Sequence, residues 1–292
     1  MVSLCIKTTK NDIADFLIQS LDNITLDNVI FVQREFSKYT NIIVHYSGNS
    51  IPVFYNEITD ILTNCIIENY EPSIVHNLLI LNYFYFSNDD IDTIHHICCD
   101  TLKTNTPLNK NCTLNELLDR KEFLSNAVLK YISYNKSLVL DGFVTFRAKD
   151  YINCLDNIVD FAVSQFVINR EYAEFIELLR MYIDSKEPAV EIVHLIYANE
   201  ESILLDENKN IISLTKNNLD SKYLSDITFS SNDYALNSLL SLLPGRIIVH
   251  LVSPSDDFIN TIKLIFENRI AICDDCNICH TYKLIQLKNN SK

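Results

Sequence analysis

In the first hundred positions of the chain, some segments have the apolar pattern of strands and others have apolar residues at helical spacing. Runs rich in β-branched and aromatic residues at 3–9, 29–36 and 41–46 predict strands. Residues 12–21 instead place their apolar side chains at helical spacing, and the pattern stays helical from 52 to 102. We therefore expect a small α/β unit at the N-terminus, followed by a helical region.

Helical periodicity continues through the middle of the chain. Residues 114–134 predict one helix. Residues 151–168 and 171–185 predict two more, because each carries apolar side chains at a spacing of three and four along one stripe. Such stripes must pack against another part of the protein, so the central region is expected to add helices to a core.

A polar stretch offers the clearest linker in the chain. Residues 103–113 are polar and contain Pro107, which is typical of a linker. A chain of 292 residues is long enough for one large domain or for two ordinary ones. We therefore expect two segments, 1–105 and 106–292, with a single domain as the alternative.

The last third of the chain alternates strands and helices. Residues 189–197 predict a buried strand, because apolar residues run through them almost without interruption. We expect it to pair with 203–205 and 211–214 around the polar turn 206–210. A helix at 233–243 follows. This part of the chain is therefore expected to contain a sheet.

A strand, a helix and a second strand then follow with short links. Residues 246–252 and 270–273 predict the strands, and 257–268 predicts the helix. Ser253 has the position of an N-cap serine, with Pro254 at the first helical position. Such short links predict a right-handed parallel crossover. The predicted fold class is therefore α/β, with a mixed α+β arrangement as the alternative.

Composition and charge indicate a soluble protein of the cytoplasm. The formal net charge of −14 repels phosphate backbones and anionic lipid head groups, so we expect no nucleic-acid partner. The first residues lack the apolar core of a signal peptide. The most apolar stretch, 73–86, is shorter than the ~20 residues that span a bilayer, so we expect no membrane insertion. Nine cysteines, an odd number, predict reduced thiols.

The scarcity of glycine excludes several classes of enzyme. The chain has three glycines, far apart, whereas glycine-rich phosphate loops need several close together. This excludes P-loop and Rossmann nucleotide sites, and the G-x-S-x-G, H-E-x-x-H and EF-hand motifs are also missing. We therefore expect a protein that is not an enzyme. The alternative is an unfamiliar catalytic site formed by Arg147, Lys149, His194 and His250.

One cluster near the C-terminus has the chemistry of a metal site. Three thiols and an imidazole recur within a short segment, in Cys273, Cys276, Cys279 and His280. Thiolates at C-x-x-C spacing suit Zn²⁺ or an iron–sulfur cluster. The neighbours Cys279 and His280 cannot easily point at the same tetrahedral centre. We therefore expect either a zinc or iron–sulfur site at these residues, or reduced thiols that bind no ion.

Other interpretations of these residues fit their context less well. Cys276-x-x-Cys279-His280 has the form of a c-type haem attachment site, but that attachment takes place outside the cytoplasm. A dithiol redox pair needs its first cysteine at a helix N-terminus, whereas we expect these cysteines to follow a strand and precede a polar tail. His194 and His250 each lie within an apolar strand, which predicts core histidines.

Several landmark segments occur along the chain in a characteristic order. They are FRAKDY at 146–151, EYAEFIELL at 171–179, EIVH at 191–194, YLSD at 223–226, LP ahead of IIVH at 243–250, and C-x-x-C-x-x-C at 273–279. In this order and spacing, the chain resembles the YtxC family of sporulation proteins from endospore-forming bacteria over residues 110–280. The resemblance implies a cytoplasmic protein associated with sporulation, and it brings no catalytic residue to this chain.

Since no catalytic template is present, we expect the protein to act through contacts with a protein partner. The helix at 171–185 carries Tyr172, Phe175 and Tyr182. We expect these aromatic side chains to pack into the core, because a helical apolar face usually packs inward, and a contact surface is the alternative. The alternative function is metal binding by the C-terminal cysteine cluster.

Overall fold

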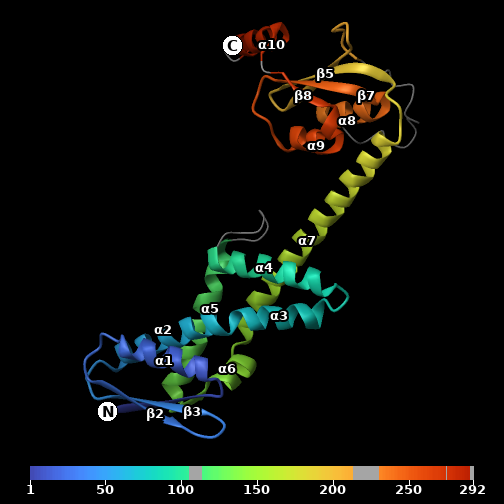
Figure 1. The fold of residues 1–292 in the computed structure, drawn as a ribbon. Helices are drawn as coiled ribbons and strands as arrows, with labels where there is room; N and C mark the ends of the chain where they lie inside the picture. Colours follow the sequence, from blue (N-terminus) through green and yellow to red (C-terminus); the bar gives the residue numbers. More distant parts are fainter. Residues whose placement is uncertain (105–113, 213–229, 274, 290–292) are drawn as a thin grey trace, which may run out of the picture. The chain divides into compact units, whose positions relative to one another are not determined.

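The structure of this chain, a computed structural model, describes residues 1–104, 114–212, 230–273 and 275–289. By their contacts the residues divide into two units, Met1–Ile168 and Asn169–Lys292. Within the described residues the strands form two four-stranded sheets, and helices make up most of the rest (Figure 1). The predicted α/β class is therefore confirmed. In the same described part of the chain, no helix has both the length and the apolar character for crossing a bilayer.

The first unit is built on a mixed sheet. Its strands are β1 (Val2–Thr8), β2 (Val29–Glu35), β3 (Thr40–Tyr46) and β4 (Ser137–Val139), in the order β2-β3-β1-β4. Strand β1 pairs antiparallel with β3 and parallel with β4. Every second residue of β3 is buried and β1 alternates in the same way, so one face of this sheet carries the core.

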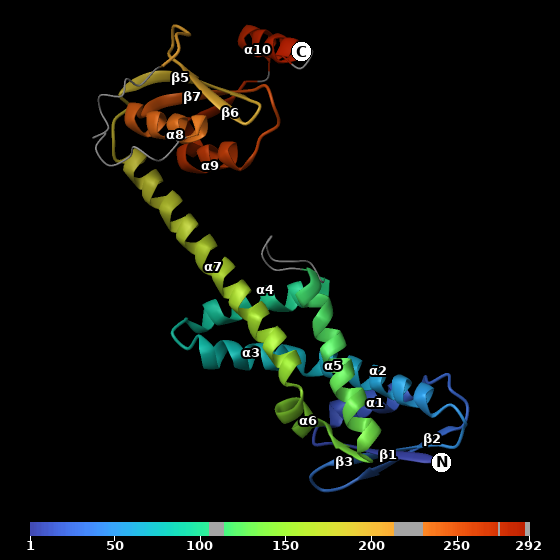
Figure 2. The same ribbon diagram turned by 180° about the vertical axis from the view of Figure 1, so that it is seen from behind.

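Helices cover that face and extend the core. In both views α1 and α2 lie along one side of the sheet (Figures 1 and 2). The buried residues of strands and helices form one continuous apolar cluster. The helices of this unit are α1 (Asn11–Asp22), α2 (Ile51–Asn69), α3 (Glu71–Asn82), α4 (Asn88–Thr104), α5 (Leu114–Tyr134), α6 (Leu140–Arg147) and the first part of α7 (Lys149–Asp184).

The contacts divide the chain at a different place from the predicted linker. Residues 105–113 of that linker lie outside the described residues. Helices α4 and α5, on either side of it, both contribute to the apolar cluster of the first unit, through Ile94 and Val128 among others. The division falls inside α7, between Ile168 and Asn169. The two-segment division at 105/106 stays a prediction.

Helix α7 replaces the two separate helices that the sequence predicted between 151 and 185. The helix runs without a break from Lys149 to Asp184, because the residues around 168–171 include no proline or glycine that would end it. Its apolar stripe changes direction instead. Tyr172, Phe175 and Tyr182 are exposed rather than packed, which corrects the expectation for these residues, while Ile176 and Ile183 are buried.

The second unit contains a sheet with three parallel strands. Its strands are β5 (Val190–Ala198), β6 (Glu201–Leu205), β7 (Pro244–Leu251) and β8 (Ile270–Ile272), in the order β6-β5-β7-β8. Strand β7 pairs parallel with both β5 and β8, which confirms the parallel pairing of the predicted strand-helix-strand unit, and β6 is antiparallel to β5. Ile211 forms an antiparallel bridge with Leu205, as expected. Residues 213–214 of the predicted 211–214 strand lie outside the described residues.

The two faces of this sheet have different surroundings. Val193, Leu195 and Val249 pack in an apolar cluster with α8 (Ser231–Leu242) and α9 (Asp257–Phe266). Because side chains alternate along a strand, His194 and His250 belong to the opposite face. Helix α10 (Asn277–Asn289) lies on the side of the sheet away from α8 and α9 (Figures 1 and 2).

The N-cap of α9 differs from the predicted one. Asp256, rather than Ser253, occupies the cap, and its carboxylate accepts a hydrogen bond of 3.2 Å from the backbone N–H of Ile259. The same carboxylate accepts a hydrogen bond from the hydroxyl of Tyr197, a buried residue of β5. Ser253 instead accepts a bond from the N–H of Asn199 in the turn between β5 and β6. Asp256 therefore joins α9 to the sheet.

Replacing Asp256 by alanine should destabilise the second unit. The Asp256→Ala variant loses a helix cap and leaves the Tyr197 hydroxyl without this acceptor, so we expect the free energy of unfolding to fall by about 2 kcal/mol. Urea unfolding measures the loss. The neighbouring, exposed Asp257 gives a matched control, and Asp257→Ala should change stability by less than about 0.5 kcal/mol. Equal effects of the two variants would contradict the role of Asp256.

Candidate metal centre

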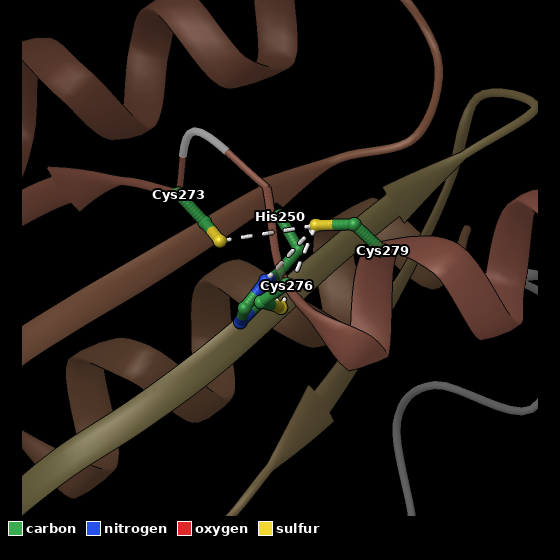
Figure 3. Close-up of side chains that lie close together, drawn as sticks. All are labelled: His250, Cys273, Cys276 and Cys279. Carbon is green, nitrogen blue, oxygen red and sulfur yellow. Dashed lines mark hydrogen bonds between the residues drawn. The ribbon is translucent and has the colours of Figure 1, made fainter.

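Four side chains from separate segments of the second unit meet on the face of its sheet that lies away from α8 and α9. His250 belongs to β7, Cys273 follows β8, Cys276 immediately precedes α10, and Cys279 lies in the first turn of α10. Figure 3 shows the three sulfur atoms and the imidazole pointing toward a common centre. Their ligand atoms all lie within 4.8 Å of one another.

Four of the six separations between these atoms are close to those of a tetrahedron around a single ion. The Sγ atom of Cys279 lies 3.8 Å from those of Cys273 and Cys276. The Nδ1 atom of His250 lies 3.4 Å from the sulfurs of Cys276 and Cys279. With metal–ligand bonds typical of zinc, a regular tetrahedron separates two sulfurs by about 3.8 Å, and a sulfur and a nitrogen by about 3.5 Å.

Local structure explains how each candidate ligand reaches this place. The parallel pairing of Val249 with Ile272 sets the end of β8 beside β7, and the N–H of Cys273 donates to the carbonyl of Val249 at 2.9 Å. Cys273 therefore lies beside His250. Residues three apart on a helix lie on the same side, so Cys276 and Cys279 present their sulfurs together at the start of α10.

Helix α10 corrects the expectation that a polar tail follows the cysteines. Cys276 lies at the N-terminal end of this helix, and its carbonyl accepts the N–H of His280 at 3.0 Å. Burial alone would raise the pKa of Cys276, but the backbone N–H of Cys279, the Cys273 thiol and the N–H of Ile278 lower it below the ordinary value. By contrast, burial and bonds with the other two thiols raise the pKa of Cys273 to about 12. The helix end therefore favours thiolate at Cys276.

His250 is a buried histidine, as predicted, but its ring nitrogens face polar partners. His250 is only 2% exposed. Its Nδ1 faces the thiols, and its Nε2 lies 2.9 Å from Nδ1 of His194. Burial, and then the nearby His194 and Lys209, lower the pKa of His250. The imidazole is therefore neutral at pH 7, the form that binds a metal ion. The sequence pattern did not place His250 in the candidate site, because residue 250 lies far from the cysteines along the chain.

His280 lies outside this group of candidate ligands. Its Nε2 lies 3.1 Å from a carboxylate oxygen of Asp275, and the side chain is 63% exposed. As a neighbour of Cys279 on one helix, it points about 100° away from it. The geometry thus brings the three predicted cysteines together, with His250 rather than the predicted His280 as the fourth member of the group.

The alternative catalytic residues divide between the two units. Arg147 and Lys149 belong to the first unit, where Arg147 lines a pocket together with Lys130, Tyr131 and Asp150. His194 and His250 belong to the second unit and contact each other. Each unit therefore contains two of these four described side chains.

Comparisons with known proteins identify the family of the chain. A model of the YtxC-like family matches residues 56–271, which include both His194 and His250 and end just before Cys273. A protein of Bacillus subtilis (strain 168), named "Uncharacterized protein YtxC", is 25% identical over 156 residues, or 53% of this chain and 55% of that protein. The match thus spans about half the length of this curated relative. No solved structure matches the chain.

Proposed function

The chain belongs to the YtxC-like family, and we propose that this family member binds one Zn²⁺ ion through His250, Cys273, Cys276 and Cys279. The observation that carries the proposal is the spacing of these atoms, because four of their six separations agree with a tetrahedral zinc site of the Cys₃His type. Zinc in such closed sites has a structural role, because no coordination position is left for a substrate.

Zinc fits these ligands better than an iron–sulfur cluster does. A cluster distributes its ligands over several iron atoms, whereas the donor atoms here all lie within 4.8 Å of one another and suit one ion. Three thiolates and an imidazole are also a common structural zinc set. The ion would tie the start of α10 to β7 and to the end of β8.

A second proposal concerns the wider role of the protein. Following the family resemblance, we propose that it acts in the cytoplasm of sporulating bacteria through contact with a protein partner. The supporting observation is a group of exposed apolar side chains on the second part of α7, which we call the α7 surface. It consists of Tyr172, Phe175, Leu178, Met181 and Tyr182. Phe175 is 52% exposed and Leu178 65% exposed, which is unusual for clustered large apolar residues.

Elemental analysis tests the zinc site. Protein purified anaerobically under reducing conditions should contain about one zinc ion per chain, as expected for a single Cys₃His site. Cys276→Ser, Cys279→Ser and His250→Ala should each lose most of the metal. His280→Ala should keep it, because that imidazole contacts Asp275 instead. Cys5→Ser, in the first unit, is a matched thiol control.

The same samples show which outcome would contradict this assignment. Circular dichroism separates loss of metal from loss of fold in each variant. Visible absorption bands together with stoichiometric iron would mean that the site holds an iron–sulfur cluster instead of zinc. A folded wild-type protein without metal would leave the cysteines as ordinary thiols. Metal lost in His280→Ala but kept in His250→Ala would restore the ligand set predicted from the sequence.

Removal of the metal should release α10. The cysteines at the start of this helix are expected to hold it through the ion, so chelation should speed amide hydrogen exchange over 279–283 at least tenfold, while α8 keeps its protection. Mass spectrometry with and without a zinc chelator makes this measurement. Unchanged exchange in α10 would mean that other contacts hold the helix in place.

Site-specific crosslinking tests the α7 surface. A photoreactive amino acid at Leu178 should give one discrete adduct in sporulating cells, and the double variant Phe175→Asp/Met181→Asp should abolish it, because charge on this surface opposes apolar contact. The probe at the adjacent Glu177 is the matched control. A smear of adducts, or the same adduct in vegetative cells alone, would contradict the proposed partner in sporulation.

A further inference from the structure

His250 has two ring nitrogens, and each faces a different partner. Its Nδ1 lies 3.4 Å from the sulfurs of Cys276 and Cys279, and its Nε2 lies 2.9 Å from Nδ1 of His194. The two rings are nearly parallel, with centroids 5.2 Å apart. This second contact lies outside the four ligands and is not needed to complete a tetrahedron.

The strand register brings the two histidines together. In the parallel pairing of β5 with β7, Ile196 is opposite His250 and His194 is opposite Ile248. Residues two apart on a strand share a face, so His194 lies one diagonal step from His250 on the same face. A side chain of this length at residue 194 therefore reaches His250 without any bend in the backbone.

We propose that His194 is a positioning residue of the zinc site, which accepts a hydrogen bond from Nε2–H of His250 and so directs Nδ1 of His250 at the ion. This inference rests on the proposed zinc site. The proton count supports it. A neutral imidazole has one donor and one acceptor nitrogen, and a metal ion needs the lone pair of the acceptor. If Nδ1 of His250 binds the ion, its proton lies on Nε2, which then donates to Nδ1 of His194.

The arrangement follows a general property of metal-binding histidines. Their second nitrogen usually donates to a carboxylate, a carbonyl or water, and this bond sets the tautomer and the orientation of the ring. Loss of such a partner typically lowers metal affinity 10- to 100-fold. Here the partner is a second imidazole. His194 then carries its own proton on Nε2, because its Nδ1 acts as an acceptor.

Metal competition with two variants tests this role. In His194→Asn, the amide oxygen stands close to the former place of Nδ1 and can still accept the bond. In His194→Leu, a side chain of similar size has no acceptor. Titration of zinc against a chromophoric chelator should show affinity about 10- to 100-fold weaker for the leucine variant, and within about threefold of wild type for the asparagine variant. His45→Leu, which removes a strand histidine of the first unit, should leave the affinity unchanged.

A spectroscopic measurement that begins with the wild-type protein gives a readout that does not depend on the stability of a variant. In the ¹⁵N-labelled, zinc-loaded wild type, His250 should be protonated at Nε2 and bound to zinc through an unprotonated Nδ1, with a slowly exchanging Nε2 proton. That slow proton should disappear in His194→Leu and persist in His194→Asn. A purely structural role of His194 would not change this signal selectively.

The outcomes separate the two proposals. If the wild type binds no zinc, the zinc site itself is wrong. If the wild type binds zinc but His194→Leu binds it equally well, the site stands and the positioning role of His194 is overturned. A zinc-loaded wild type in which His250 is bare at Nε2 also overturns the role, because that nitrogen would then be the ligand.

Discussion

The parallel pairing of β7 with both of its neighbours is the constraint on which the second unit depends. Because β5 and β8 flank β7 in the same direction, the side chains of all three strands alternate in step. One face receives Val249 and its neighbours, which bury an apolar cluster under α8 and α9. The other face carries the histidines, and the chain leaves β8 next to them. A shift of one residue in this register would exchange the apolar and polar faces.

Much of this fold could be predicted from periodicity, because strands such as β1 and β3 alternate regularly and α1 has a clear apolar stripe. The failures have physical causes. Strand β4 is three residues long, too short to show a period, and it is recognisable only by its pairing with β1. Helix α7 changes the direction of its apolar stripe where it passes from one apolar cluster to the other, and that change imitates a break between two helices.

The candidate site could be predicted only in part, for a similar reason. Cys273, Cys276 and Cys279 lie close together in the sequence, and soft ligands at that spacing are informative by themselves. The fourth candidate ligand depends on a strand register that joins residues far apart in the chain, so the sequence predicts His250 as an ordinary core histidine and the adjacent His280 as the fourth ligand. Similarly, the start of α10 at Asn277 could not be recognised in a segment of low apolar periodicity.

The separation of the proposed ligands along the chain has a consequence for the unfolded protein. An ion held by both His250 and Cys273 would close a long loop that contains the last residue of β7, all of α9 and all of β8. Closing a loop of this length removes conformational freedom from the unfolded chain, worth about 3 kcal/mol when a disulfide does it. In a compartment that keeps thiols reduced, disulfides are not available for this purpose. The zinc ion would therefore act as a reversible cross-link, formed and removed by metal exchange rather than by oxidation.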